Sequence, residues 1–144
     1  MNKNATKAPA YRSRLSAERS DELYVRILEH LTQGKRYRDP GYNAKKLAID
    51  LHTNTRYISA AVANGTGDNY NALVNSFRLR DARKMLCSTR MDHLSVEEIG
   101  LLAGFSSRQA FYIAFSRVYN HETPAGYRAE MHRHRHGVET SQDS

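Results

Sequence analysis

The chain has 144 residues, with 22 Lys or Arg against 15 Asp or Glu, and carries a formal net charge of +7 at pH 7 with its histidines neutral. This length suits one compact unit rather than a catalytic domain beside a separate sensor domain. No apolar run approaches the roughly 20 residues of a transmembrane helix, the first twenty residues lack the apolar core of a secretory signal, and one cysteine cannot form an internal disulfide. The composition therefore favours a globular cytoplasmic protein without a membrane partner.

The positive charge is unevenly distributed along the chain. Residues 1–20 have a net charge of +4 and residues 21–90 of +5, whereas residues 91–128 and 129–144 each have −1. Such a basic region indicates a polyanionic partner such as nucleic acid. Charge alone leaves open an ordinary solvated basic surface.

The N-terminal region is predicted to be a basic arm followed by an amphipathic helix. Residues 1–20 contain few large apolar side chains and several Lys or Arg, which is typical of disorder. Ser20 or Asp21 is a suitable N-cap for the helix, and Gly34 is a suitable stop ahead of a polar loop over 34–42. The apolar face has the spacing i, i+3, i+4, i+7 and consists of Tyr24, Ile27, Leu28 and Leu31.

A pair of short helices joined by a tight turn is predicted over about 43–65. Asn43 caps the first helix, Asn54 caps the second, and Asn64-Gly65 ends the pair. The side chains expected to face inward are Leu47, Ala48 and Leu51 on the first helix and Ile58, Ala61 and Val62 on the second.

A longer helix is predicted over about 69–87, and the short pattern then returns over about 95–119. Ser95 and Ser107 are the N-caps of this second pair, and Gly104 stops its first helix. The side chains expected to face inward are Ile99, Leu102 and Ala103 on the first helix and Phe111, Ala114, Phe115 and Val118 on the second.

The predicted fold class is all-α, because no segment has the two-residue alternation of a strand. After the second pair, Thr123-Pro124 opens a last short helix that ends near Arg128, and residues 129–144 are predicted to be a flexible tail. The repeated pattern suggests helix-turn-helix units, in which the second helix lies in the major groove of DNA. Short helices with tight turns also occur in other helical bundles, so the spacing alone does not decide between the two.

Two stretches of the chain resemble a known family. The segment SVEEIGLLAGFSSRQAFYIAFSRVYNHETPAGYR (95–128) contains Ile-x-x-x-x-Gly-Phe, a Phe-x-x-x-Phe helix and a terminal Pro-x-x-Tyr-Arg. The segment 47–86 contains Arg-Leu-x-x-Ala-x-x-x-Leu, which starts at Arg78. In this order and spacing the motifs resemble those of AraC-type transcription regulators. The resemblance runs from about Glu22 to Arg128, roughly three quarters of the chain.

The resemblance implies a seven-helix, bilobed, homeodomain-like DNA-binding domain over about 21–128. Two helix-turn-helix subdomains, joined by the long linker helix at 69–87, would read neighbouring major-groove segments about one turn, roughly 34 Å, apart. The resemblance also implies binding to double-stranded promoter DNA and contact with RNA polymerase.

The outward faces of the second helix of each pair supply the candidate base-reading residues. Arg56 can donate two hydrogen bonds to guanine or can clamp a phosphate, Ser59 can donate or accept, and Ala60 offers only a methyl contact to thymine. On the later helix Gln109 suits adenine, and Arg108 suits guanine or a phosphate. By family position, the base-facing group there is Arg108, Gln109, Tyr112 and Ile113.

Three features depart from the family pattern. Ala60 and Ile113 stand where the family usually has a long polar or basic residue, which removes potential base contacts. An exposed Ile113 requires a thymine methyl or a partner protein. The loop after Phe115 is one residue longer than usual, with Asn120 where Gly is common, and Asn tolerates the left-handed conformation. Together with the net negative charge of residues 91–128, these departures predict that the second helix-turn-helix binds DNA more weakly than the first.

Cations and cap residues near these helices are candidate phosphate contacts. With roughly six to ten such contacts, the affinity for DNA would fall by about three to five decades between 50 and 200 mM salt. Arg78 is expected to be structural, because its family counterpart belongs to the packing motif. The candidate phosphate contacts are Lys45, Lys46, Asn54, Arg80, Arg83, Lys84, Ser107 and Arg117.

No catalytic or cofactor motif is recognisable. The sequence has no nucleophile elbow, phosphate loop, HExxH pair or paired-Cys motif, so neither enzyme activity nor a cofactor is expected, and no small-molecule effector site is evident. Cys87 is expected to be buried as a small hydrophobe. The alternating His132, His134 and His136 are expected to be solvated rather than to bind a metal.

The sequence therefore predicts a bacterial, cytoplasmic, sequence-specific transcription regulator of the activator class, associated with the nucleoid when bound to DNA. It is either a stand-alone regulator controlled by its own abundance or the output piece of a longer chain. Two alternatives stay open. One is a protein-interaction module on the same scaffold, suggested by the small or apolar Ala60, Ala63 and Ile113. The other is a non-specific nucleic-acid-binding protein that uses the basic arm.

Overall fold

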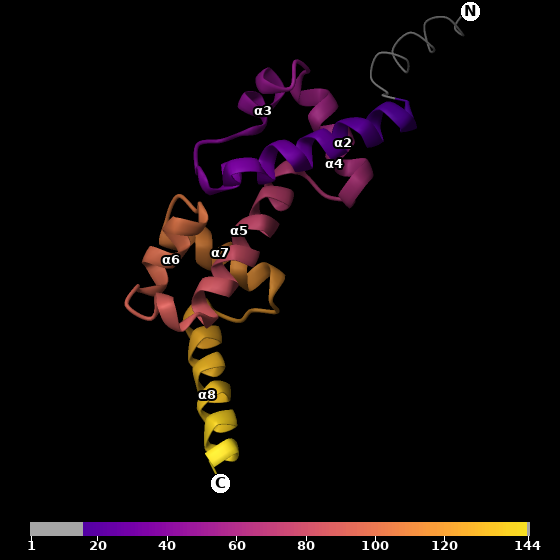
Figure 1. Ribbon diagram of the computed structural model, residues 1–144. Helices are drawn as coiled ribbons and strands as arrows, with labels where there is room; N and C mark the ends of the chain where they lie inside the picture. Colours follow the sequence, from indigo (N-terminus) through magenta and orange to yellow (C-terminus); the bar gives the residue numbers. More distant parts are fainter. Residues whose placement is uncertain (1–15, 144) are drawn as a thin grey trace, which may run out of the picture. The chain divides into compact units, whose positions relative to one another are not determined.

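The computed structural model describes the backbone of residues 16–143 and the side chains of residues 16–135 (Figure 1). This part of the chain forms seven α-helices and two short 3-10 helices, with no strand, which confirms the predicted all-α class. None of these helices combines the length and the apolar character needed to cross a bilayer. The elements in chain order are α2 (Ala17–Thr32), η1 (Gln33–Arg38), α3 (Ala44–Asp50), α4 (Thr55–Thr66), α5 (Tyr70–Cys87), η2 (Thr89–Met91), α6 (Val96–Ala103), α7 (Arg108–Val118) and α8 (Pro124–Asp143).

The chain divides into two compact units between Asn75 and Ser76, within α5. Unit 1 contains α2, η1, α3, α4 and the start of α5, and unit 2 contains the rest of α5, η2 and α6 to α8. Each unit therefore contains one pair of short helices and part of the long helix.

The first helix begins earlier than predicted. The Ser16 Oγ accepts a hydrogen bond from the Arg19 backbone N–H at 3.2 Å and caps α2. Ser20, the predicted cap, is only 1% exposed, and its Oγ accepts a hydrogen bond from the Asn64 side-chain amide at 3.0 Å. Residues 16–20 are therefore not part of a disordered arm, and the rest of the predicted arm, residues 1–15, lies outside the described residues.

The stretch after α2 is more ordered than the predicted loop. Gly34 (φ 64°) and Lys35 (φ 53°) lie in the left-handed region, which breaks the helix at the predicted stop. Residues 33–38 then form η1, which buries Tyr37 in the core of unit 1. Burial of the Tyr37 ring explains why this stretch is ordered where the polar sequence predicted a loop. The polar pattern does not show that this ring belongs to the core.

The first pair of short helices forms as predicted, with both caps in place. The Asn43 Oδ1 accepts from the Lys46 backbone N–H and the Asn54 Oδ1 from the Tyr57 backbone N–H, each at 2.9 Å. α4 packs on α2 and on α3. The buried apolar side chains of these three helices are Leu23, Ile27, Leu31, Leu47, Ala48, Ile58, Ala61 and Val62.

A glycine allows α2 and α4 to approach closely. A Cβ at Gly65 would lie 2.7 Å from the Tyr24 ring, so only glycine fits there without movement of the ring. The predicted end of α4 at Asn64-Gly65 is wrong, because the helix continues to Thr66 and Gly67 (φ 76°) is the left-handed cap. Gly65 therefore serves helix packing rather than helix termination.

Unit 2 is built on an aromatic core. The Phe111 ring lies 5.1 Å from the Phe105 ring and 6.0 Å from the Phe115 ring, centroid to centroid, and Phe115 lies 5.8 Å from Tyr127. The cluster also contains the apolar face of α5 and residues of α6. These additional core residues are Leu79, Ala82, Met85, Leu86, Ile99 and Ala103.

The second pair of short helices also has its predicted caps. The Ser95 Oγ accepts from the Glu98 backbone N–H at 3.0 Å, the Ser107 Oγ from the Ala110 backbone N–H at 3.1 Å, and Gly104 (φ 116°) ends α6 in the left-handed region. Asn120 adopts the left-handed conformation expected of it, with φ 51°.

Two residues of this pair were predicted to face inward and do not. Leu102 is 50% exposed and Val118 is 56% exposed. Within α6, Ile99 and Ala103 already fill the core-facing positions, and α7 needs only Phe111 and Phe115 to reach the aromatic core. A helical period assigns an apolar residue to a face but does not show how wide the buried face is.

The last helix is much longer than predicted. α8 continues from Pro124 to Asp143, so the predicted stop at Arg128 is wrong and residues 129–143, predicted to be a flexible tail, are helical. One face, with the spacing i, i+3, i+4, i+7, contacts the rest of unit 2 and explains the extension. Arg128 donates to the Leu94 and Met91 carbonyls, and Arg135 donates to the Cys87 carbonyl. Between them, Met131 packs on the core and His132 lies 3.3 Å from Asp92.

Candidate nucleic-acid interface

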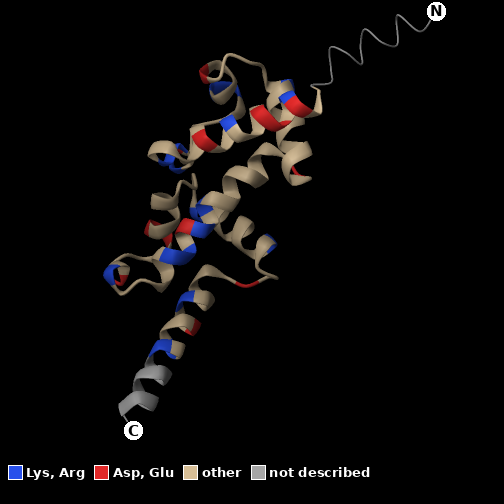
Figure 2. Ribbon diagram, turned by 45° about the vertical axis from the view of Figure 1, so that its right-hand side comes forward, with Lys and Arg blue, Asp and Glu red and all other residues tan. Residues whose placement is uncertain are grey.

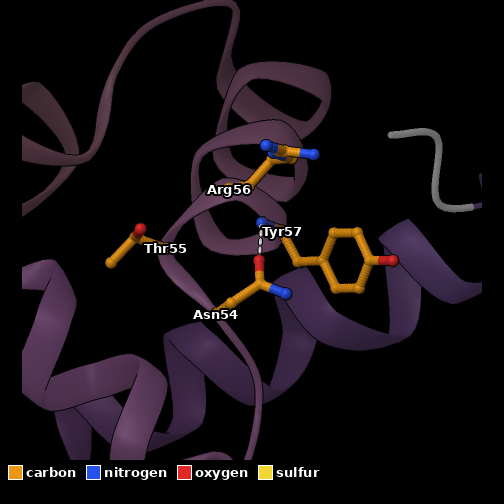
Figure 3. A pocket seen from close by; sticks show the side chains of 4 residues that line it. All are labelled: Asn54, Thr55, Arg56 and Tyr57. Carbon is orange, nitrogen blue, oxygen red and sulfur yellow. Dashed lines mark hydrogen bonds between the residues drawn. The ribbon is translucent and has the colours of Figure 1, made fainter. Parts of the chain in front are cut away.

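The N-terminus of α4 presents a polar hollow. Asn54, Thr55, Arg56 and Tyr57 line a space of about 460 Å³ at the first turn (Figure 3). The Asn54 Oδ1 is engaged by the cap, which leaves its Nδ2 amide as the donor that can face outward. Because the first turn of a helix directs backbone N–H groups and partial positive charge outward, this end of α4 can receive a phosphate or the edge of a base.

The predicted reading residues of α4 lie outside the core. Arg56 and Ser59 are exposed, and Ala60 is half-buried. The opposite face of the helix is closed by Ile58 and Val62, neither of which is exposed. The side of α4 that carries Arg56 is therefore available to a ligand.

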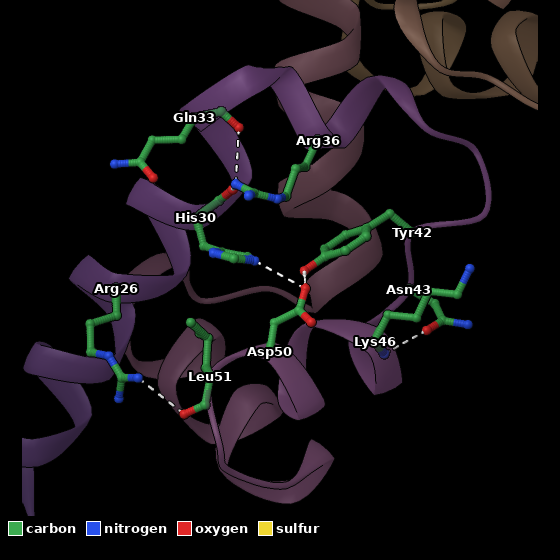
Figure 4. A network of polar contacts seen from close by, with 9 residues as sticks. All are labelled: Arg26, His30, Gln33, Arg36, Tyr42, Asn43, Lys46, Asp50 and Leu51. Carbon is green, nitrogen blue, oxygen red and sulfur yellow. Dashed lines mark hydrogen bonds and ion pairs between the residues drawn. The ribbon is translucent and has the colours of Figure 1, made fainter.

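A polar network fixes α3, the helix that precedes the reading helix. The Tyr42 hydroxyl donates to the Asp50 Oδ2 at 2.6 Å, and the His30 Nε2 lies 3.1 Å from the same oxygen (Figure 4). Arg36 donates to the His30 carbonyl and Arg26 to the Leu51 carbonyl, at 2.9 and 3.0 Å. The network ties α2, η1 and the end of α3 together, and so fixes the start of the turn that leads into α4.

The network also shifts two pKa values. The hydrogen bond from Tyr42, followed by that from His30, holds the pKa of the Asp50 carboxyl below its ordinary value. Burial and the hydrogen bond to Asp50 raise the pKa of Tyr42. Asp50 therefore stays ionised and Tyr42 stays protonated, which is the donor and acceptor arrangement that the network needs. No motif pointed to these residues, because they lie as far as 20 positions apart.

The outward face of α7, which is predicted to read bases, contains a stacked pair. The Arg108 guanidinium lies 4.5 Å from the centroid of the Tyr112 ring, one turn further along the helix. Arg108 and Gln109 are exposed, and Tyr112 is half-buried. The ring restricts the orientation of the guanidinium through a cation–π contact, so Tyr112 acts as a support for Arg108.

Ile113 is an exposed apolar residue on the same face. It is 56% exposed, as its predicted outward position requires. Its side chain has no hydrogen-bonding group and can contact a base pair only through a thymine methyl. The outward face of α7 thus combines the stacked guanidinium of Arg108, the amide of Gln109 and the aliphatic side chain of Ile113.

Most candidate phosphate contacts are exposed. Figure 2 shows the Lys and Arg positions along the ribbon. Asn54 and Ser107 are the N-caps of α4 and α7, which places them at the positive ends of these two helices. The remaining exposed candidates are Lys45, Lys46, Arg80, Lys84 and Arg117.

Arg83 differs from the other candidates. Its guanidinium carbon lies 4.6 Å from the Tyr119 ring centroid and 5.0 Å from that of Tyr127. Burial alone would lower the pKa of Arg83, but hydrogen bonds to the hydroxyls of Tyr127 and Tyr119 outweigh it and raise the pKa, so the side chain stays charged. Arg83 therefore packs within unit 2 and is not simply displayed to solvent.

Two other expectations about α5 can be compared with the structure. The Arg78 guanidinium carbon lies 6.0 Å from the Phe105 ring centroid, which agrees with the expected packing role. Cys87 is half-buried rather than fully buried, and its Sγ lies 3.3 Å from the Tyr127 hydroxyl. The residues that sequence reasoning missed here are Tyr119, Tyr127 and Arg128, all of which contact α5 or η2 across long sequence separations.

The two described histidines of α8 lie beside different acidic residues. His132 lies 3.3 Å from Asp92, and His134 lies 3.9 Å from Glu130, while the His136 side chain is outside the described part. In the described residues no group of three or more His, Cys, Asp or Glu side chains is arranged to hold a metal ion.

Comparison with known proteins identifies the helical pattern. A family profile described as a helix-turn-helix domain matches residues 47–130. No curated protein matches the chain.

Two solved structures are similar to this chain. A protein of unknown function from Listeria innocua has a TM-score of 0.63 at 24% identity, with 72% of this chain and 92% of that chain covered. The C-terminal domain of the two-component response regulator yesN from Fusobacterium nucleatum has a TM-score of 0.60 at 25% identity, with 74% of this chain and 95% of that chain covered.

Proposed function

The chain belongs to the AraC-type helix-turn-helix family of DNA-binding transcription regulators, and we propose that it reads two adjacent major-groove segments, one with α4 and one with α7. One observation carries this proposal. Both helices begin at a side-chain cap and expose an arginine in the first turn, Arg56 on α4 and Arg108 on α7. In helix-turn-helix proteins the N-terminal part of the second helix meets the base edges.

We assign the base contacts by side-chain chemistry. Arg56 and Arg108 can each donate two hydrogen bonds to guanine O6 and N7, and Gln109 can pair with adenine N6 and N7. Ser59 is a flexible donor or acceptor, while Ala60 and Ile113 offer thymine methyl contacts. Tyr112 supports Arg108 rather than reading a base itself, because its ring lies beneath the guanidinium.

Phosphate contacts would fix the register of the protein on the duplex. The cap residues Asn54 and Ser107 stand where a helix dipole attracts a phosphate, and exposed lysines flank the start of α3. We propose Lys45, Lys46 and Arg117 as further contacts. We also propose RNA polymerase as its protein partner at the promoter.

The two reading helices are proposed to contribute unequally. Residues 21–90 carry a net +5 and residues 91–128 a net −1, so the field around the first helix-turn-helix attracts phosphates more strongly. We therefore propose that the first helix-turn-helix holds DNA more tightly.

Selection of bound sequences from a random duplex library tests the proposed function. The full chain should enrich a motif with two half-sites about one helical turn apart, and Arg108→Ala/Gln109→Ala should degrade only one half-site. The expected loss at a read base pair is about 1–3 kcal/mol. Uniform binding without a motif would contradict base reading and favour non-specific binding.

One observation favours a second candidate function. Leu101, Leu102 and Ile113 are exposed apolar side chains of 48%, 50% and 56% on α6 and α7, which suits a helical protein-interaction module. No retention of duplex DNA at low salt would support this candidate and contradict DNA reading.

A further inference from the structure

A cationic cavity lies in unit 2, away from the reading face of α7. It has a volume of about 590 Å³ and is lined by Arg80, Arg83, Lys84, Cys87, Tyr119 and Tyr127. The volume lies within the range of sites that bind small molecules, roughly 300–1,000 Å³. Three of the six lining residues are cations, and no acidic residue is among them.

The cavity stands at the C-terminal end of α7. Tyr119 is the C-cap of that helix, whereas Arg108 is its first residue. With 11 residues in α7 and a rise of about 1.5 Å per residue, the two ends are roughly 16 Å apart. The cavity is thus separate from the side chains that we assign to base reading.

Arg83, one of the lining residues, is held in a fixed orientation. Its guanidinium lies on the Tyr119 and Tyr127 rings, and its Nε is buried without a hydrogen-bond partner among the described residues. A buried donor without a partner is costly. Hydrogen bonds to the Tyr127 and Tyr119 hydroxyls use part of the guanidinium, and its remaining N–H groups lie in the plane that suits a carboxylate or phosphate. The Tyr127 hydroxyl, 3.3 Å from the Cys87 Sγ, helps hold the second ring in place.

Arg80 and Lys84 add two exposed charges at the same cavity. Arg80 is anchored over the Phe77 ring at 5.2 Å, and Lys84 extends from the next turn of α5. Three cations that converge without a lining acid repel one another, and a bound anion relieves this repulsion. A single exposed cation would need no such explanation.

We propose that this cavity binds a small organic polyanion, such as a tricarboxylate or an organic diphosphate, through Arg80, Arg83 and Lys84. A ligand with two or three negative charges matches the three cations, and the tyrosine rings supply an apolar wall for its carbon atoms. This site was not evident from the sequence, and it replaces the expectation that these three residues contact DNA phosphates.

Calorimetric titration of the full chain with citrate and with pyrophosphate, at constant ionic strength, tests the proposal. Wild-type protein should bind at least one of them with a dissociation constant in the millimolar range or below. Arg80→Gln/Lys84→Gln, which alters only exposed side chains, should weaken binding by tenfold or more. Arg117→Gln, an exposed cation of the same unit outside the cavity, should change it less than twofold.

Two results would overturn the proposal in this titration. One is no binding of either anion by the wild-type chain. The other is an equal loss in the Arg117 variant, which would show attraction to diffuse positive charge. The NMR signal of the Arg83 Nε–H should also shift on titration, and an unmoved signal would place the anion elsewhere.

A second arm separates a free anion from the DNA backbone. The titration is repeated with the chain saturated by a selected duplex. Retained binding supports a separate small-molecule site. Displacement of the anion by the duplex would indicate that Arg80, Arg83 and Lys84 contact DNA phosphates instead, and would overturn the proposal. The titration of the free chain uses no DNA, so a failure of anion binding there is distinguishable from a failure of base reading.

Discussion

The two helix-turn-helix pairs use the same local plan but different cores. α3 and α4 pack through small and aliphatic side chains such as Ala48, Ile58 and Val62, whereas α6 and α7 close on Phe111 and Phe115. In both pairs the N-cap side chain of each helix accepts a hydrogen bond from the backbone N–H three residues later; the N-caps are Asn43, Asn54, Ser95 and Ser107. The comparison teaches that capping and spacing define the motif, while the core can be filled by either chemistry.

The difference in core chemistry changes what each pair tolerates. A Cβ at Gly100 would lie 2.4 Å from Phe111, a fully buried ring, whereas a Cβ at Gly65 would meet Tyr24, which is only half-buried. A ring at the surface can shift, but a ring at the centre of a core cannot. Glycine is therefore more strictly required in unit 2.

The largest expected difference between the two units is in the effect of replacing a glycine by alanine on the free energy of unfolding. Gly100→Ala should lower the free energy of unfolding by about 2 kcal/mol, because overpacking a close helix contact typically costs roughly 1–3 kcal/mol. Gly65→Ala should be close to neutral, since the gain of about 1 kcal/mol in helix propensity offsets a small ring shift. Chemical denaturation monitored by circular dichroism measures both, and equal effects would break the comparison.

The next largest effect should appear in DNA affinity. Arg56→Ala should weaken binding to the selected duplex by roughly fivefold to 150-fold, which corresponds to a loss of about 1–3 kcal/mol per bidentate contact, and Arg108→Ala should weaken it less. Fluorescence anisotropy at a fixed salt concentration gives both values. A larger loss for Arg108→Ala, or equal protection of both half-sites in a footprint, would reverse the proposed asymmetry.

The salt dependence of DNA affinity should differ between variants of the first and the second helix-turn-helix pair. Lys45→Gln/Lys46→Gln should reduce the slope of log K against log salt by about 1.8, because each lost phosphate contact removes about 0.9. Arg117→Gln should reduce the slope by at most about 0.9. An unchanged slope in the double variant would show that the two lysines make no phosphate contact.

A smaller effect should follow from the stacked pair on α7. Tyr112→Phe keeps the ring under Arg108 and should bind DNA like wild type. Tyr112→Ala removes the ring and should lose about 0.5–1 kcal/mol, the usual size of an exposed cation–π contact. Comparison of the two variants by anisotropy isolates the ring, and a loss in Tyr112→Phe would instead assign a role to the hydroxyl.

The smallest effect concerns the network that holds α3. Because the pKa of Asp50 is lowered in the folded chain, its contribution to stability is present above the ordinary pKa of 3.8 and is lost as the pH falls through the folded value. Asp50→Asn should therefore be less stable than wild type at pH 7 and should approach wild type in acid. Glu22→Gln, an exposed change on α2, should show no such pH-dependent difference.

The local features of the fold were predictable from the sequence. Asn43, Asn54, Ser95 and Ser107 each cap the helix that they were predicted to cap. A cap contacts a backbone group three residues away, so its partners are all visible within a short stretch of sequence. The exposure of Arg56 and Ile113 followed equally from helical spacing.

Most of the errors involve partners that are distant in sequence. Ser20 is buried because Asn64 lies against it, and α8 continues past Arg128 because Arg128 and Arg135 reach the carbonyls of residues 91, 94 and 87. Leu102 is exposed because its neighbours already fill the core. Periodicity cannot show which of several apolar or polar residues obtains a partner.

The sequence by itself determined the all-α class, the four internal caps, the repeated helix pair and the family motif, because these depend on contacts within a turn or two. Only the tertiary structure decided how the arginines are used. Arg83 lies on two rings that are 36 and 44 positions away along the chain, and Arg128 holds η2. Charge counted along a chain does not distinguish a cation that faces DNA from one that packs, because that choice depends on which distant side chains share its surroundings.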